Sequence, residues 1–155
     1  MILKSDSPFQ FDPDRLLLRL SRTLPARVEA IQPVVDEILE VVREMRCSTG
    51  DELDIEVSLL EALANAVRHG CREDPKKTVE ISVACEEEKG ILIVVRDPGA
   101  GFDVSRIPSP ITGRNLLSKG GRGIFLINQL MDEVHHRRNG TEIWMRKVPN
   151  GEPDE

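Results

Sequence analysis

The chain has 155 residues, the length of one domain, and 39% of them are hydrophobic, which is enough for a single core. A formal net charge of -6 argues against direct nucleic-acid binding, which needs a basic face, and the scarcity of aromatic residues argues against base stacking. No segment approaches the roughly 20 apolar residues of a membrane span, so no membrane interaction is expected.

The cysteines and the N-terminal residues both bear on the compartment. The three cysteines form no C-x-x-C pair, which favours reduced thiols, and the start of the chain lacks the apolar run of a signal peptide. A cytoplasmic protein is therefore predicted. Composition further predicts a polar lead-in over residues 1–13, a single domain over 14–148 and a disordered acidic tail over 149–155.

The first half of the chain predicts one strand and two helices. Alternating leucines over Arg15–Leu24 indicate a strand, and Pro25 suits the first turn of a following helix. Apolar residues spaced by three and four over Val28–Met45 indicate that helix, which Pro33 should bend or split. A second helix is expected over Asp51–Gly70, with the apolar stripe Ile55, Leu59, Leu63 and Ala66.

The second half predicts two hairpins around a long loop. Lys77–Ala84 and Gly90–Arg96 read as antiparallel strands, and the second is apolar throughout, as in a central strand. A glycine- and proline-rich stretch over Asp97–Gly123 is long enough to indicate a functional loop. A helix over Ile124–Glu133 follows. Two strands then close the chain, Val134–Arg138 and Thr141–Lys147, with Asn139-Gly140 as a two-residue turn.

This order of elements predicts an α+β fold. Helices and mostly antiparallel strands are interspersed, which is typical of a two-layer α/β sandwich with a mixed, mostly antiparallel sheet and helices on one face.

Three segments could carry chemistry. Glu61 and Asn65 lie one helical turn apart, where a carboxylate and a carboxamide could hold a divalent cation, although an ordinary polar helix face is the alternative. Asp97 follows an apolar strand in the sequence DPGAG. Its carboxylate could accept a hydrogen bond from an amino group such as that of adenine, or the segment could be a simple turn.

The third segment is Gly120-Gly121-Arg122-Gly123, which leads into an apolar helix. Free N–H groups and the helix dipole favour a phosphate at such a place, with a flexible helix entry as the alternative. The segment matches neither a P-loop nor a dinucleotide-binding fingerprint, so those two enzyme classes are not indicated.

In this order the three segments resemble the ATP-site motifs of the histidine-kinase-like (GHKL) ATPases. EALANAVRHG (61–70), DPGAGFD (97–103) and GGRGIFLINQLMDEV (120–134) resemble the first, second and third motifs, and the similarity extends over about Leu16–Lys147. His69-Gly70 and Met131–Val134 make the chain most similar to the bacterial anti-sigma-factor serine/threonine kinases. The resemblance implies the Bergerat-type ATP-binding fold.

The resemblance also implies site residues. Glu61 would act as the general base or orient the attacking hydroxyl, and Asn65 would ligate the Mg²⁺ that bridges the phosphates of ATP or ADP. Asp97 would bind the adenine amino group, assisted by Thr141. Gly99 and Gly101 would let the backbone close around the base and sugar. Gly121 and Gly123 would form the phosphate lid, with Arg122 as a phosphate contact.

The implied function is that of a serine/threonine protein kinase of the anti-sigma-factor type. It would bind Mg-ATP and phosphorylate a small antagonist (anti-anti-sigma) protein. The alternative is a nucleotide-dependent binding module that sequesters a sigma factor or another regulator without significant catalysis. By the same resemblance, a homodimer is a further possibility.

Overall fold

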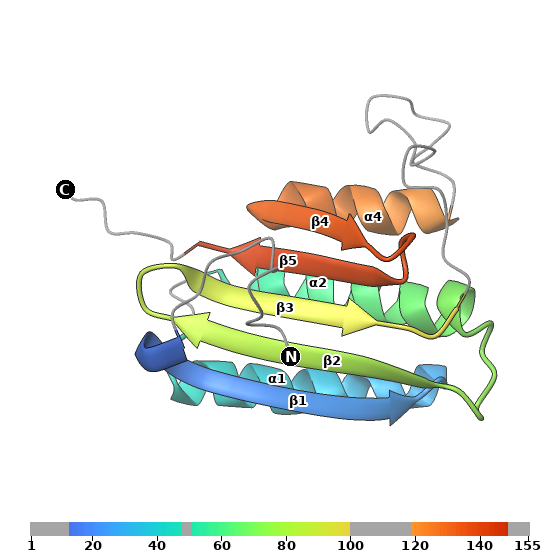
Figure 1. The fold of residues 1–155 in the computed structure, drawn as a ribbon, viewed down its shortest axis with the longest axis horizontal. Coiled ribbons are helices and arrows are strands. Elements are labelled where there is room, and N and C mark those ends of the chain that lie inside the picture. Colours follow the sequence, from blue (N-terminus) through green and yellow to red (C-terminus); the bar gives the residue numbers. More distant parts are fainter. Residues whose placement is uncertain (1–12, 48–50, 100–118, 149–155) are drawn as a thin grey trace.

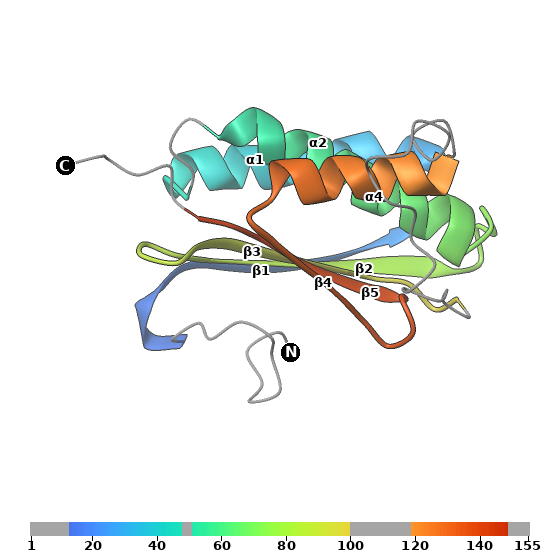
Figure 2. The ribbon, with the colours of Figure 1, turned by 90° about the horizontal axis from the view of Figure 1, so that it is seen from above.

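The computed structural model describes residues 13–47, 51–99 and 119–148. These residues form two layers, a β-sheet and a set of helices that lie across one of its faces (Figures 1 and 2). The predicted α+β sandwich with helices on one face is confirmed.

The sheet contains five strands within the described ranges, in the order β1-β2-β3-β5-β4, and every neighbouring pair is antiparallel. The expected mixed sheet is therefore antiparallel throughout in this part of the chain. β3 lies in the middle, as its continuous apolar sequence predicts. The strands are β1 (Leu16–Pro25), β2 (Thr78–Glu86), β3 (Gly90–Arg96), β4 (Glu133–Arg137) and β5 (Glu142–Lys147).

The helical layer consists of α1 (Ile31–Glu44), α2 (Glu52–Asn65) and α4 (Lys119–Leu130) in the described residues. α2 packs against both α1 and α4 and so occupies the centre of the layer. A π-helical turn, η3 (Ala66–Gly70), extends α2 to the glycine that was predicted to end it. Two short 3-10 turns, η1 (Pro13–Arg15) and η2 (Val28–Ala30), flank β1.

The main core lies between the two layers. Ile55, Leu59 and Leu63 of α2 are fully buried there, as the predicted stripe requires. β3 alternates between its faces: Ile91 and Ile93 point into this core, whereas Leu92 and Val94 join a smaller cluster with Ala84 and Trp144. Because both faces of β3 are covered, its sequence is apolar without interruption.

Both proline predictions need correction. Pro25 does not begin a helix, because it pairs in register with Thr78 and ends the edge strand β1. Pro33 is the third residue of α1 and does not interrupt it. The first four N–H groups of a helix have no intrahelical acceptor, so a proline there costs no hydrogen bond. The irregular backbone lies before Pro33, at η2.

The last helix and the last turn also differ from the prediction. α4 begins at Lys119, so the glycine-rich segment forms its first turns and does not precede it, and α4 ends at Leu130. Packing of the start of α4 against α2 overrides the low helix propensity of glycine. Arg137 pairs with Glu142, so the closing hairpin has a four-residue loop in which Arg138, Asn139 and Gly140 have positive φ angles.

Several predictions fall wholly or largely outside the described residues: the lead-in over 1–13, the tail over 149–155 and most of the loop over Asp97–Gly123. Cys47, Cys71 and Cys85 are buried and form no disulfide, as expected. Among the residues that the structure describes, no helix is long and apolar enough to span a bilayer.

Candidate nucleotide site

Glu61 and Asn65 lie on α2 and face the first turns of α4. Both side chains are half-buried, and Gly123 of α4 is buried against them. A Cβ atom built on Gly123 would lie 2.9 Å from Glu61 Oε1 and 3.2 Å from Asn65 Nδ2. The side chains of Glu61 and Asn65 therefore converge on Gly123, and a side chain at this position would displace them. Carboxylate and carboxamide oxygens are ligands that hard divalent cations prefer.

Asp97 follows β3 directly and its half-buried carboxylate lies between two glycines. The N–H of Gly99 donates to Asp97 Oδ1 at 2.8 Å. A Cβ atom on Gly70 would lie 2.3 Å from Asp97 Cγ, and one on Gly99 would lie 2.3 Å from the carbonyl oxygen of Gly70. Burial raises the pKa of the Asp97 carboxyl, and the hydrogen bond from Gly99 opposes that shift. The carboxylate is held in one place and retains an oxygen to accept a ligand proton.

Thr141 is joined to Asp97 through the backbone. The N–H of Asp97 donates to the carbonyl oxygen of Thr141 at 2.9 Å, which extends the β3–β5 ladder by one bond. The Thr141 hydroxyl donates to the carbonyl oxygen of Arg138 at 2.8 Å. Thr141 thus adjoins Asp97 through the backbone, and its hydroxyl donates within the hairpin loop; its assistance to Asp97 at the adenine stays a prediction.

These groups lie at one end of the molecule. The end of β3, the end of α2, the start of α4 and the β4–β5 turn meet at the same end of the sheet (Figures 1 and 2). The N-terminus of a helix offers free N–H groups and a positive dipole end, both of which favour an anion. Side-chain oxygens, a fixed carboxylate and a helix N-terminus are therefore gathered in one region.

Some predicted residues are not tested by this geometry. Gly101 lies outside the described residues. Gly121 and Arg122 belong to the first turn of α4, and their phosphate contacts stay predictions. His69 is exposed at the end of η3. Cys71 is buried, and burial together with the charge of Asp97 raises the pKa of its thiol, as expected of an inert cysteine.

The sequence does not predict the contact between Gly70 and the carboxylate of Asp97. Its position predicts only a helix stop at Gly70, and the dipeptide His69-Gly70 at the end of the first motif is the one signal that points to a role at the site. The π-helical turn η3 brings Gly70 to Asp97, and such turns are frequent at functional sites.

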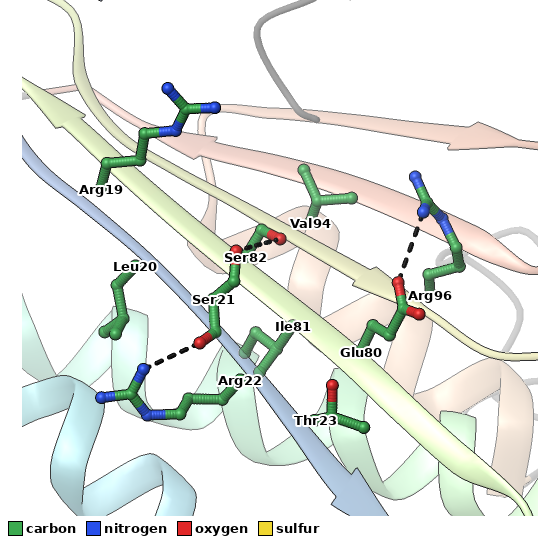
Figure 3. Close-up of a pocket in the computed structure, with 10 residues that line it drawn as sticks. All are labelled: Arg19, Leu20, Ser21, Arg22, Thr23, Glu80, Ile81, Ser82, Val94 and Arg96. Atoms are coloured by element: carbon green, nitrogen blue, oxygen red, sulfur yellow. Dashed lines mark hydrogen bonds and ion pairs between the residues drawn. The ribbon is translucent and has the colours of Figure 1, made fainter.

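A separate hollow of about 200 Å³ lies over β1, β2 and β3 (Figure 3). Ser21 and Ser82 meet there at 3.1 Å, beside Val94 of the smaller apolar cluster. The hollow includes none of the predicted nucleotide residues, so it is no part of the candidate site.

Comparisons with known proteins identify the family of this chain. The family model described as "Histidine kinase-like ATPase domain" matches residues 24–147. The serine-protein kinase RsbW of Bacillus velezensis is 30% identical over 136 residues, covering 83% of this chain and 84% of the relative. The enzyme of the same name from Bacillus subtilis is 34% identical over 112 residues, covering 67% and 69%. The anti-sigma F factor of Geobacillus stearothermophilus is 30% identical over 132 residues, covering 81% and 80%.

The chain belongs to the histidine kinase-like ATPase family. The predicted membership is confirmed, as is the resemblance to the anti-sigma-factor serine kinases. Family membership makes the chain a nucleotide-binding protein, with the candidate site at the end of the sheet described above.

Proposed function

We propose that the chain is a serine/threonine protein kinase of the anti-sigma-factor type, which binds Mg-ATP and phosphorylates a small antagonist protein. The observation that carries the proposal is the arrangement of Glu61 and Asn65 around Gly123 at the first turns of α4. The names of the relatives from Bacillus velezensis and Bacillus subtilis, both serine-protein kinases, support the same reaction.

Asp97 recognises the adenine base. Its carboxylate is fixed by the Gly99 N–H and flanked by Gly70, and it accepts a hydrogen bond from the exocyclic amino group. Gly99 and Gly101 leave the backbone free to approach the base and sugar, and Thr141 supports Asp97 through the backbone bond. The phosphates then extend toward α4, where Gly121, Arg122 and Gly123 lie at the positive end of the helix.

Asn65 and Glu61 act on the phosphates and on the acceptor hydroxyl. The oxygen donors suit Mg²⁺, and Asn65 would hold that ion, which neutralises phosphate charge when bound. Glu61 orients the acceptor hydroxyl and accepts its proton. The hydroxyl oxygen forms the new bond to the γ-phosphorus, the bond to the bridging oxygen breaks, and ADP leaves. Positioning and charge neutralisation account for most of the catalysis in this reaction.

The test is transfer of labelled γ-phosphate from ATP to a cognate antagonist protein in the presence of Mg²⁺. The Glu61→Gln variant keeps the shape of the side chain and removes the base, so we expect transfer to fall about 100-fold or more while ATP still binds. Glu56→Gln, on the same helix and near Arg43, is the matched control and should transfer normally. Absence of transfer by the wild-type protein, or full transfer by Glu61→Gln, would contradict the proposal.

A second function is favoured by the relative named anti-sigma F factor. The chain would sequester a sigma factor in a nucleotide-dependent way, either beside its kinase activity or without it. A pull-down with purified sigma factors in ATP and in ADP tests this. Retained binding by Glu61→Gln would separate sequestration from phosphotransfer, and no binding in either nucleotide would exclude the function.

Two accompanying predictions concern the state of the protein. We propose a cytoplasmic location, where a sigma factor and its antagonist would be available. A homodimer is also proposed; Val28 and Met45, 40% and 41% exposed on the α1 region, offer apolar surface for it. Light scattering of the purified protein tests the dimer, and a monomer at all concentrations would exclude it.

A further inference from the structure

Glu142, the first residue of β5, carries a buried carboxylate beside the candidate adenine site. Only 3% of the residue is exposed, although a buried charge is costly unless it is paired. It directly follows Thr141 in the chain, and it pairs in register with Arg96, the residue directly before Asp97. The buried charge therefore lies at the junction of the two segments that define the base-recognising end of the sheet.

Three donors surround this carboxylate. Trp144 Nε1 donates to Oε1 at 2.7 Å and Arg96 Nε donates to Oε2 at 2.5 Å, while Arg138 Nε lies 3.6 Å from Oε2. Burial alone raises the pKa of Glu142, but the bonds from Trp144 and Arg96 and the two arginine charges outweigh it and hold the pKa below its ordinary value. Glu142 is therefore ionised at neutral pH, and each of its carboxylate oxygens accepts a hydrogen bond.

The ion pairs of Glu142 with Arg96 and Arg138 extend to both strands that flank β3, which are β2 and β5. On one side, Arg96 also reaches Glu80 of β2 at 3.4 Å, so its guanidinium spans from β5 to β2 on the face of the sheet away from the helices (Figure 3). On the other side, Arg138 belongs to the β4–β5 loop, and its carbonyl oxygen accepts a hydrogen bond from the Thr141 hydroxyl. The Asp97 N–H bond to Thr141 lies next in the ladder after the Arg96–Glu142 pair.

Side chains of neighbouring strand residues point to opposite faces. Arg96 points to the face of the sheet away from the helices, toward Glu142, while the carboxylate of Asp97 contacts Gly70 on the helical side. A shift of the β3 end relative to β5 therefore moves Asp97 relative to η3. Among the described residues, the carboxylate of Asp97 accepts a hydrogen bond only from the N–H of Gly99, two residues away, and such a local bond moves with it.

We propose that Glu142 is a positioning residue for adenine recognition, which acts through Arg96 and the Asp97–Thr141 backbone bond to hold the Asp97 carboxylate against the 6-amino group. This inference rests on the proposed ATP site and adds a residue that does not touch the ligand. A merely structural residue weakens every nucleotide alike. A positioning residue for this contact weakens only nucleotides that carry the 6-amino group.

The experiment compares ATP with purine riboside triphosphate, which lacks the 6-amino group, by calorimetry on the full chain. We expect Glu142→Gln to bind ATP about tenfold more weakly and the analogue with unchanged affinity, since a hydrogen bond to a charged group is involved. Glu133→Gln is the matched control: Glu133 also pairs across strands with an arginine, Arg146 at 2.5 Å, but at the far end of β5 from Asp97. It should change neither affinity.

Asp97→Asn separates the inference from the proposed function. If the wild-type protein does not distinguish ATP from the analogue, or if Asp97→Asn keeps the distinction, the adenine site itself is wrong and the inference fails with it. If Asp97→Asn abolishes the distinction but Glu142→Gln weakens both ligands equally or neither, only the inference is overturned.

A second variant covers the case in which Glu142→Gln does not fold. Trp144→Phe keeps an aromatic ring in the smaller apolar cluster and removes the Nε1–H donor to Glu142 together with part of the ring volume. We expect the same selective loss of ATP affinity, of about threefold. Equal weakening of both ligands in this variant, or no change in either, would overturn the proposal.

Discussion

Gly123→Ala should separate the stability of the protein from its phosphotransfer activity. The new methyl group would lie 2.9 Å from Glu61 Oε1 and 3.2 Å from Asn65 Nδ2. Nonbonded heavy atoms prefer about 3.5 Å or more, so the Glu61 carboxylate must retreat by about half an ångström. Both obstructing atoms are the ends of flexible side chains, and the backbone of α2 can stay in place.

Gly123→Ala is expected to preserve or raise thermal stability while it lowers the rate of phosphotransfer. Gly123 is the fifth residue of α4, and replacing an interior helix glycine by alanine gains up to about 1 kcal/mol, which offsets the cost of moving Glu61. We expect an unchanged Tm or a rise of about 2–4 °C. A misplacement of about 1 Å can cost about 100-fold in rate, so half of that should lower kcat/KM for phosphotransfer about tenfold.

The assay is phosphotransfer from ATP to the antagonist protein, beside thermal unfolding of the same samples. Asn128→Ala is the control, because Asn128 is exposed on the same helix and, within the described part of the chain, its side chain donates only to the carbonyl oxygen of Ile124. It should keep full activity. Wild-type activity in Gly123→Ala would refute the reasoning, because Glu61 and Asn65 would then tolerate displacement. A fall in Tm of more than about 5 °C would show that the steric cost was underestimated.

Three further predictions concern other parts of the molecule. Gly70→Ala places a methyl group 2.3 Å from Asp97 Cγ, so ATP affinity measured by calorimetry should fall at least about tenfold, and an unchanged affinity would contradict the described contact. Leu59→Ala empties the centre of the core and should lower the free energy of unfolding in urea by about 3–5 kcal/mol; a loss below about 1 kcal/mol would contradict the packing. Burial and the neighbouring charge of His135 lower the pKa of His136, so the unfolded chain takes up its proton first, and stability should fall as pH drops below about 6.5. His136→Asn should show a shallower fall in urea unfolding between pH 7 and 5, and an identical slope would exclude this origin.

The elements that follow a local period could be predicted from the sequence. The buried stripe of Ile55, Leu59 and Leu63 follows directly from the spacing of a helix, and the continuous apolar run of β3 indicated a strand covered on both faces. Their order along the chain also indicated the fold class. Prolines were less informative, because the effect of Pro33 depends on whether it lies in the first turn of the helix, and helix boundaries are poorly defined by propensity.

The candidate site was predictable as a set of motifs and only partly as an arrangement. Glu61, Asn65, Asp97 and Gly123 were selected because their residue types suit a nucleotide and a cation. Gly70 and Glu142 were not, because neither brings a chemical group to the nucleotide. Gly70 matters through the space it leaves for Asp97, and Glu142 through the strand that it pairs with.

The helical and strand periods and the three polar motifs follow from the amino-acid sequence alone, because they depend on residues a few positions apart. Which distant groups meet depends on how the elements pack in the folded chain. Asp97 lies between Gly70 and Gly99, and Glu61 lies against Gly123, only because α2, β3 and α4 end or begin at the same end of the sheet (Figure 1). The position of α4 and of the β4–β5 turn at that end depends on the insertion of β5 between β3 and β4, which is set by hydrogen bonds between strands far apart in the chain. No local period records such pairing, so its consequences at the site could be found only in the folded molecule.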